Sequence, residues 1–65
     1  MIRLKEIRLD NKMKRTELAE LLGVVSKTVA AYEQGVHEPN IATLIKLSKI
    51  FNTTIDNLVG NDRDV

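Results

Sequence analysis

Apolar side chains recur along this chain at intervals of three and four residues, the spacing that places them on one face of an α-helix. No segment alternates strictly between apolar and polar residues, so β-strands are not expected. The pattern predicts an all-α fold with five short helices, over residues 2–11, 15–22, 26–34, 41–51 and 55–59. Helices this short depend on packing against one another for their stability.

Glycine and small polar residues mark where these helices should begin and end. Gly23 and Gly35 stand where the second and third helices should stop, in a left-handed conformation that glycine adopts easily. Asn40 and Thr54 precede the fourth and fifth helices and are suited to cap them. Because Gly60 can close the fifth helix, we expect one domain over residues 1–60 and a flexible tail over residues 61–65.

A tight turn at Gly23 joins the two helices predicted at residues 15–22 and 26–34. Ala19, four residues before the glycine, lets the helices cross closely, and Val29, six residues after it, can fill the space between them. This spacing is what a helix-turn-helix pair requires. The side chains predicted to face inward are Leu18, Leu22, Val24 or Val25, Val29 and Tyr32, which leaves Ser26, Lys27, Ala30 and Ala31 facing outward.

Positive charge is concentrated at one end of the chain. Residues 1–15 carry six Lys and Arg against two acidic residues, a net charge of +4. Residues 52–65 carry one Arg against three Asp, a net charge of −2, although the whole chain is at only +1. This asymmetry favours a polyanionic partner near the basic end, and charge alone leaves open the alternative of a solvated charged helix face.

The composition excludes several classes of protein. The 65 residues contain no cysteine, which excludes disulfides and Cys-based zinc sites, and His37, as the single histidine, cannot form a metal site alone. There is no nucleophile–base set and no Gly-rich phosphate loop, so we expect no enzyme, no cofactor and no small-molecule substrate. No apolar run approaches the roughly 20 residues that span a bilayer, and the charged N-terminal segment is unlike a signal peptide, so we expect a cytoplasmic protein.

Four segments carry a distributed pattern: LKEIR at residues 4–8, ELAELLGV at 17–24, TVAAYEQG at 28–35 and EPNIATLIKLSKIFNTTIDNLV at 38–59. Through them, about nine tenths of the chain resembles the lambda-repressor/Cro-like helix-turn-helix family of bacterial and phage DNA-binding proteins, also called the XRE family. The resemblance implies a compact five-helix domain that binds double-stranded DNA. It implies a third helix in the major groove and the start of the second helix against the phosphate backbone.

The resemblance also nominates residues that would touch base edges. Lys27 is the first choice, because lysine can donate to guanine O6 and N7, the alternative being a phosphate contact or a solvated side chain. Ser26 could touch a base or cap its helix, and Thr28 could reach a phosphate or a thymine methyl or pack against the turn. Ala31 and its neighbour Ala30 offer only apolar contact, for instance with a thymine methyl, where the family usually has long polar groups.

The residues expected at phosphates are Lys14, Arg15, Gln34 and His37, with the backbone N–H groups of the loop after the third helix. Lys14 and Arg15 fall at the start of the second helix, where a cation opposes the helix dipole unless a phosphate is bound. We therefore expect salt-dependent backbone contacts. His37 could equally be an ordinary surface residue.

Other residues have expected structural roles. The resemblance implies a buried ion pair between Arg8 and Glu33, the alternative being two independent surface charges. Tyr32 is expected in the core rather than as a base-stacking platform.

The resemblance implies a transcriptional regulator, a repressor that acts as a homodimer on a pseudo-palindromic operator. Its dimer surface is expected at Ile55, Leu58 and Val59, partly exposed, although these residues could instead close the monomer core. A second hypothesis, motivated by the two alanines, is a protein-interaction module, antitoxin-like or paired with a regulator, in which DNA binding is weak or lost.

Overall fold

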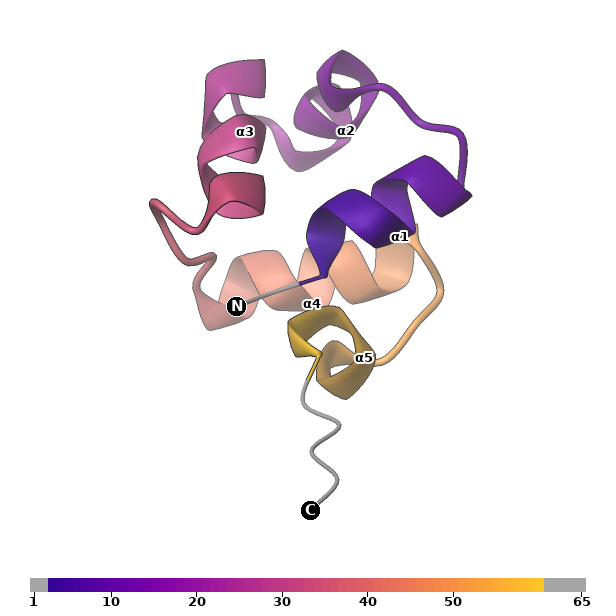
Figure 1. The fold of residues 1–65 in the computed structure, drawn as a ribbon. Helices are drawn as coiled ribbons and strands as arrows, with labels where there is room; N and C mark the ends of the chain where they lie inside the picture. The colour runs from indigo at the N-terminus through magenta and orange to yellow at the C-terminus, as the bar shows by residue number, and fades with distance from the viewer. Residues whose placement is uncertain (1–2, 61–65) are drawn as a thin grey trace.

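The computed structural model of the protein describes residues 3–60 and shows five helices joined by short turns (Figure 1). No strand occurs within that range. The helices are α1 (Leu4–Asp10), α2 (Arg15–Leu22), α3 (Ser26–Gln34), α4 (Ile41–Ile50) and α5 (Ile55–Val59). The all-α fold is therefore confirmed, and the tail predicted at residues 61–65 lies outside the described residues.

The predicted bounds of α2, α3 and α5 match the structure, whereas α1 and α4 are shorter than predicted. Asn11 caps the end of α1, and the next residue, Lys12, takes a left-handed conformation with φ 53°. Phe51 caps the end of α4 in the same way, followed by Asn52 with φ 52°. These left-handed residues reverse the chain without glycine, so the apolar pattern alone did not show where the helices end.

The core is a single apolar cluster to which every helix contributes. In Figure 1, α2 and α3 lie in the upper part of the molecule, and α4 and α5 close its lower side. α4 packs against both α2 and α5, and α1 packs against α3 and α5. The buried apolar side chains are Leu4, Ile7, Leu18, Ala19, Leu22, Val29, Leu44, Leu47, Phe51 and Leu58.

Leu58 corrects one expectation about the dimer surface. Its side chain is 0% exposed and belongs to the core, so the prediction of a partly exposed Leu58 was wrong. Ile55 and Val59 are half-buried and pack against the same core. The carbonyl oxygen of Leu58 also accepts a hydrogen bond of 2.6 Å from the backbone N–H of Arg3, which ties α5 to the start of α1.

Polar residues cap the helices largely as the sequence predicts. The Asn40 side chain accepts from the backbone N–H of Thr43 at 2.9 Å, and the Thr54 hydroxyl accepts from that of Asn57 at 3.0 Å. At the start of α2, the Glu17 carboxylate accepts from the backbone N–H of Lys14 at 2.7 Å. Each bond satisfies a backbone donor that the helix itself leaves free.

The α2–α3 turn has the geometry that the spacing predicts. Gly23 lies in the left-handed region with φ 75° and ψ 31°, and the N–H of Val24 donates to the carbonyl of Ala19 at 3.0 Å. Ala19 and Val29 are both buried where α2 and α3 pack together. Of the two candidate inward residues, Val24 packs on the core, whereas Val25 points to solvent.

Replacing Gly23 with Ala should lower the free energy of unfolding by about 1–2 kcal/mol, because alanine disfavours the left-handed conformation. A Cβ at this position would meet no atom within 4 Å, so the loss arises from the backbone alone. Gly23→Asn should lose less, since asparagine tolerates this region. Urea unfolding measures both variants, and equal losses for Ala and Asn would contradict this explanation.

Candidate nucleic-acid interface

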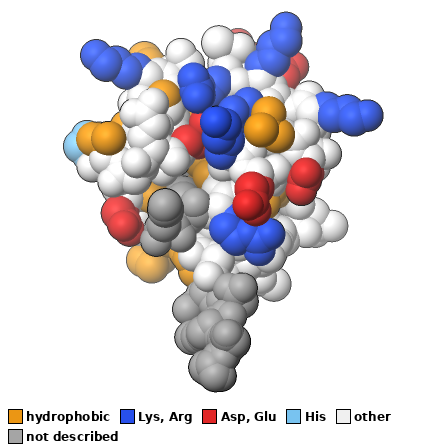
Figure 2. Space-filling view, in the orientation of Figure 1, with side chains coloured by type: hydrophobic (Ala, Val, Ile, Leu, Met, Phe, Trp, Pro, Cys, Tyr) orange, Lys and Arg blue, Asp and Glu red, His pale blue; other side chains and the backbone are white. Residues whose placement is uncertain are grey.

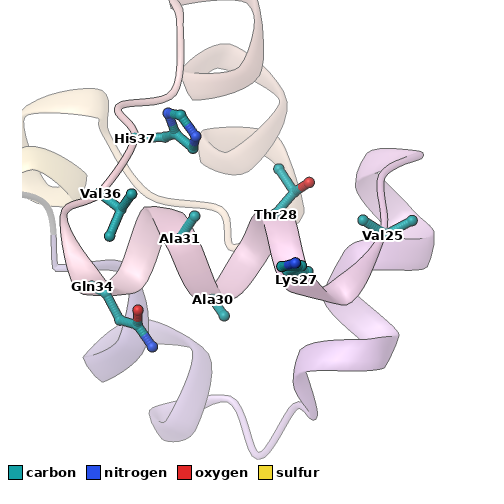
Figure 3. Close-up of a pocket in the computed structure, with 8 residues that line it drawn as sticks. All are labelled: Val25, Lys27, Thr28, Ala30, Ala31, Gln34, Val36 and His37. Carbon is teal, nitrogen blue, oxygen red and sulfur yellow. The ribbon is translucent and has the colours of Figure 1, made fainter.

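An open groove runs along the exposed side of α3 (Figure 3). α3 supplies one wall, and the chain after Gly35 (φ 79°) turns back to supply the other. The N–H groups of Val36 and His37 both donate to the carbonyl of Ala31, at 3.0 and 3.3 Å, which holds this loop beside the helix. The groove is lined by Val25, Lys27, Thr28, Ala30, Ala31, Gln34, Val36 and His37.

The backbone N–H groups of this loop, which the resemblance places at phosphates, donate within the protein in this structure. The N–H of Gly35 also donates within the protein, to Tyr32 at 3.3 Å. The three amides therefore satisfy carbonyls at the end of α3. The polar side chains that this segment offers a ligand are those of Gln34, at the end of α3, and His37.

Three of the predicted base-edge residues, Lys27, Thr28 and Ala31, line the groove together. Ser26 does not: it lies in a separate depression against α2, which Glu17 and Glu20 also line. Ser26 is not the helix cap either, because the N-cap position is Val25, whose side chain makes no capping hydrogen bond. The structure therefore separates Ser26 from the other three candidates.

The groove surface is mainly aliphatic. Val25 is 66% exposed and Val36 67% exposed, and Ala30 and Ala31 are half-buried between them. Lys27 is exposed and is the one Lys or Arg among the described lining residues, none of which is Asp or Glu. The lining therefore combines apolar contact with one cation and uncharged polar groups. Sequence reasoning did not nominate Val25 or Val36, although an apolar residue at a helix N-cap is an unusual feature.

A buried carboxylate joins three helices behind this groove. The Glu33 side chain is 1% exposed, and its two oxygens receive the Arg8 guanidinium at 2.5 Å from Nε and 3.4 Å from Nη2. Arg8 also donates from Nη1 to the carbonyl of Met13 at 2.9 Å. The structure thus contains the Arg8–Glu33 ion pair that the resemblance implies, and extends it to the α1–α2 turn.

Arg15 joins the same carboxylate, which the sequence did not predict. Its Nε lies 3.1 Å from Glu33 Oε1, and its side chain remains 42% exposed. Glu33 therefore compensates the positive charge that Arg15 places at the start of α2. Lys14, the N-cap of α2, is exposed. The contact places Arg15 near the end of α3, the end of the helix at which Gln34, another phosphate candidate, also stands.

Lys and Arg side chains gather over the upper part of the face in Figure 2, where α2 and α3 lie. Tyr32 packs against the core, as expected. Between residues 3 and 60, no group of three or more His, Cys, Asp or Glu side chains is arranged to hold a metal. None of the helices described is both long enough and apolar enough to cross a membrane.

Comparison with known proteins agrees with this geometry. A sequence model of a helix-turn-helix family matches residues 4–58. The chain belongs to this family. The relatives described below are named as transcriptional regulators, which confirms the XRE-type resemblance and the expectation of a family of regulators rather than enzymes.

Two relatives in the helix-turn-helix family are named for a role in transcription. The HTH-type transcriptional regulator AnsR of Bacillus subtilis is 36% identical over 61 residues, which cover 94% of this chain and 53% of AnsR. The cryptic phage CTXphi transcriptional repressor RstR of Vibrio cholerae is 30% identical over 59 residues, 91% of this chain and 53% of RstR. The chain therefore spans about half the length of each.

A solved structure shows the same helix-turn-helix fold. The crystal structure of a transcriptional regulator from Listeria innocua superposes with a TM-score of 0.85 at 39% sequence identity. The match covers 95% of this chain and 58% of that one.

Replacing Arg8 with Met should destabilise the protein by about 3–5 kcal/mol, because the buried Glu33 carboxylate loses its main partner. Adding Glu33→Leu should recover part of that loss, since the buried charge is then gone. Glu6→Gln is the matched control: it breaks the exposed Arg3–Glu6 pair, at 3.0 Å, and should change stability by less than about 1 kcal/mol. Urea unfolding measures these variants and Glu33→Leu alone, and a loss in the double variant equal to the sum of the two single losses would contradict the coupling.

Proposed function

We propose that this chain is a sequence-specific DNA-binding regulator of transcription, acting in the cytoplasm, that places α3 in the major groove of double-stranded DNA. The observation that carries the proposal is the exposed side of α3. Lys27, Thr28 and Ala31 line one open groove there, and no carboxylate is among its described lining residues. A duplex presents base edges at the floor of a groove about 12 Å wide, which admits an α-helix.

The phosphate contacts proposed for α2 and the loop fit this orientation. Lys14 and Arg15 stand at the N-terminus of α2, and Gln34 and His37 stand at the end of α3 and after it. The exposed part of Arg15 can donate to a phosphate while its Nε remains on Glu33. These groups would set the register on the duplex, while Lys27 would contribute base readout.

We further propose a repressor that binds a pseudo-palindromic operator as a homodimer. RstR, one of the relatives, is named a transcriptional repressor. One recognition helix reads few base pairs, so a second copy about 34 Å away on the same face of DNA would supply the missing affinity. The half-buried Ile55 and Val59 on α5 are the proposed contact residues.

The second candidate function is a protein-interaction module with weak or lost DNA binding. The aliphatic groove lining favours it, since apolar surface also suits a partner protein. Titration of random duplex DNA at increasing salt separates the two functions. A regulator loses affinity steeply as salt rises because counterions compete for the phosphates, whereas an interaction module shows little salt-dependent binding.

Lys27→Ala should lower the discrimination between a selected operator and random DNA. If Lys27 contacts a guanine edge, the loss in the binding free-energy difference should be about 1–3 kcal/mol. Arg15→Ala should instead weaken both complexes about equally and reduce the salt slope by about 1. Fluorescence anisotropy at several salt concentrations measures both variants, after thermal unfolding shows that each is folded. The same effect of both changes on the specificity ratio would show that this division of roles is wrong.

A duplex with two half-sites should bind two chains and should bind them at least about 100-fold more tightly than a single half-site, because the dimer links the two contacts. Inserting half a helical turn, about five base pairs, between the half-sites should abolish this gain by moving them to opposite faces. Analytical ultracentrifugation gives the stoichiometry. One chain per two-half-site duplex would contradict the homodimer.

A further inference from the structure

Valine is an unfavourable residue at position 25 in the free protein. It occupies the N-cap of α3, where Ser, Thr, Asp and Asn are preferred because their side chains accept a hydrogen bond from the first turn. The valine side chain makes no such bond, and it is 66% exposed to solvent. Neither capping nor core packing therefore explains an aliphatic side chain here.

Val36 has the same character at the other side of the groove. Its side chain is 67% exposed, although its backbone is held by the 3.0 Å hydrogen bond to Ala31. Figure 3 shows the side chains of Ala31 and Val36 close together on one side of α3, with Val25 beyond the start of the helix. Three aliphatic groups thus lie along one groove and are fixed by backbone contacts rather than by core packing.

The charge of the groove lining indicates which kind of partner surface the three aliphatic side chains contact. Lys27 lies among them, and no described lining residue is acidic, so the groove suits an anionic partner. On a duplex, the apolar group that the major-groove edge presents is the thymine 5-methyl. Aliphatic side chains have no donor or acceptor for the other base-edge groups.

We propose, on the basis of the DNA-binding function above, that Val25, Ala31 and Val36 recognise thymine through its 5-methyl group. In this arrangement Lys27 supplies hydrogen bonding at a neighbouring base, and the aliphatic groups supply sequence preference by burying methyls. Specificity then comes from apolar contact at positions where long polar side chains are absent.

The test starts from a duplex selected by the wild-type protein from a random pool. Each thymine is replaced in turn by deoxyuridine, which removes only the 5-methyl and keeps the pairing with adenine. Affinity should fall by about fourfold at each methyl that the groove buries, and it should stay unchanged elsewhere. Fluorescence anisotropy measures each duplex.

Val25→Thr provides the protein side of the test. Threonine keeps the branched shape but replaces one methyl with a hydroxyl that can cap α3, so the Tm should rise while the thymine-to-uracil affinity ratio falls. Ile41→Thr is the matched control, because Ile41 is also 67% exposed but does not line the groove. The thymine-to-uracil affinity ratio of Ile41→Thr should equal that of the wild-type protein.

Two results would overturn the proposal in distinguishable ways. Salt-dependent binding of the selected duplex with no loss at any deoxyuridine position would leave the DNA-binding function standing and remove methyl recognition. Failure to bind any duplex in a salt-dependent manner would remove both. A higher Tm for Val25→Thr with an unchanged ratio would remove Val25 from the recognition surface.

Discussion

The buried Glu33 carboxylate is the interaction on which the arrangement of this domain depends. A charge removed from water must be paired, and here two guanidinium groups pair it, Arg8 from α1 and Arg15 from α2. Because Glu33 lies at the end of α3, these contacts hold that helix against both of the others. Arg8 adds the Met13 carbonyl, so the α1–α2 turn is held by the same group.

The same interaction determines which side of α3 is free. Val29 and Glu33 are four residues apart, on the side that faces the protein, and both side chains are buried there. Lys27 and Ala31 are also four residues apart and lie on the side that lines the groove. The pair of arginines also leaves one positive charge in excess of the carboxylate, and the half-exposed Arg15 brings it to the surface. The contacts that orient the helix thus also provide a cation beside it.

Much of the fold could be predicted because its signals are local. Gly23 and Gly35 mark turns by their conformational freedom, and Asn40 and Thr54 cap helices through bonds that span three residues. The main contact that the sequence did not predict joins residues that are far apart in the chain. Arg15 and Glu33 are 18 positions apart with nothing in either neighbourhood to link them. The left-handed conformation of Lys12, just after α1, has no signal in its residue type, whereas asparagine tolerates this region and Asn52 could have marked the end of α4.

The site was predicted less completely than the fold, because small rotations of a helix decide which side chains share a surface. Ser26 and Lys27 are adjacent, yet they lie in different depressions. Apolar periodicity predicts that Leu58 is buried, but it does not say whether its own core or a second chain buries it; its own core does. For Val24 and Val25 the periodicity left open which one faces inward, and the left-handed turn before them packs Val24 against the core and exposes Val25.

The central claim is that Glu33 fixes α3 so that its groove side meets DNA. The most direct measurement is an NMR titration of the labelled protein with its selected duplex, following each backbone amide. The account predicts that the largest shifts fall on the start of α2, on α3 and on Val36 and His37, with little change in α4. Large shifts confined to α4 and α5, with the α3 amides unchanged, would contradict it.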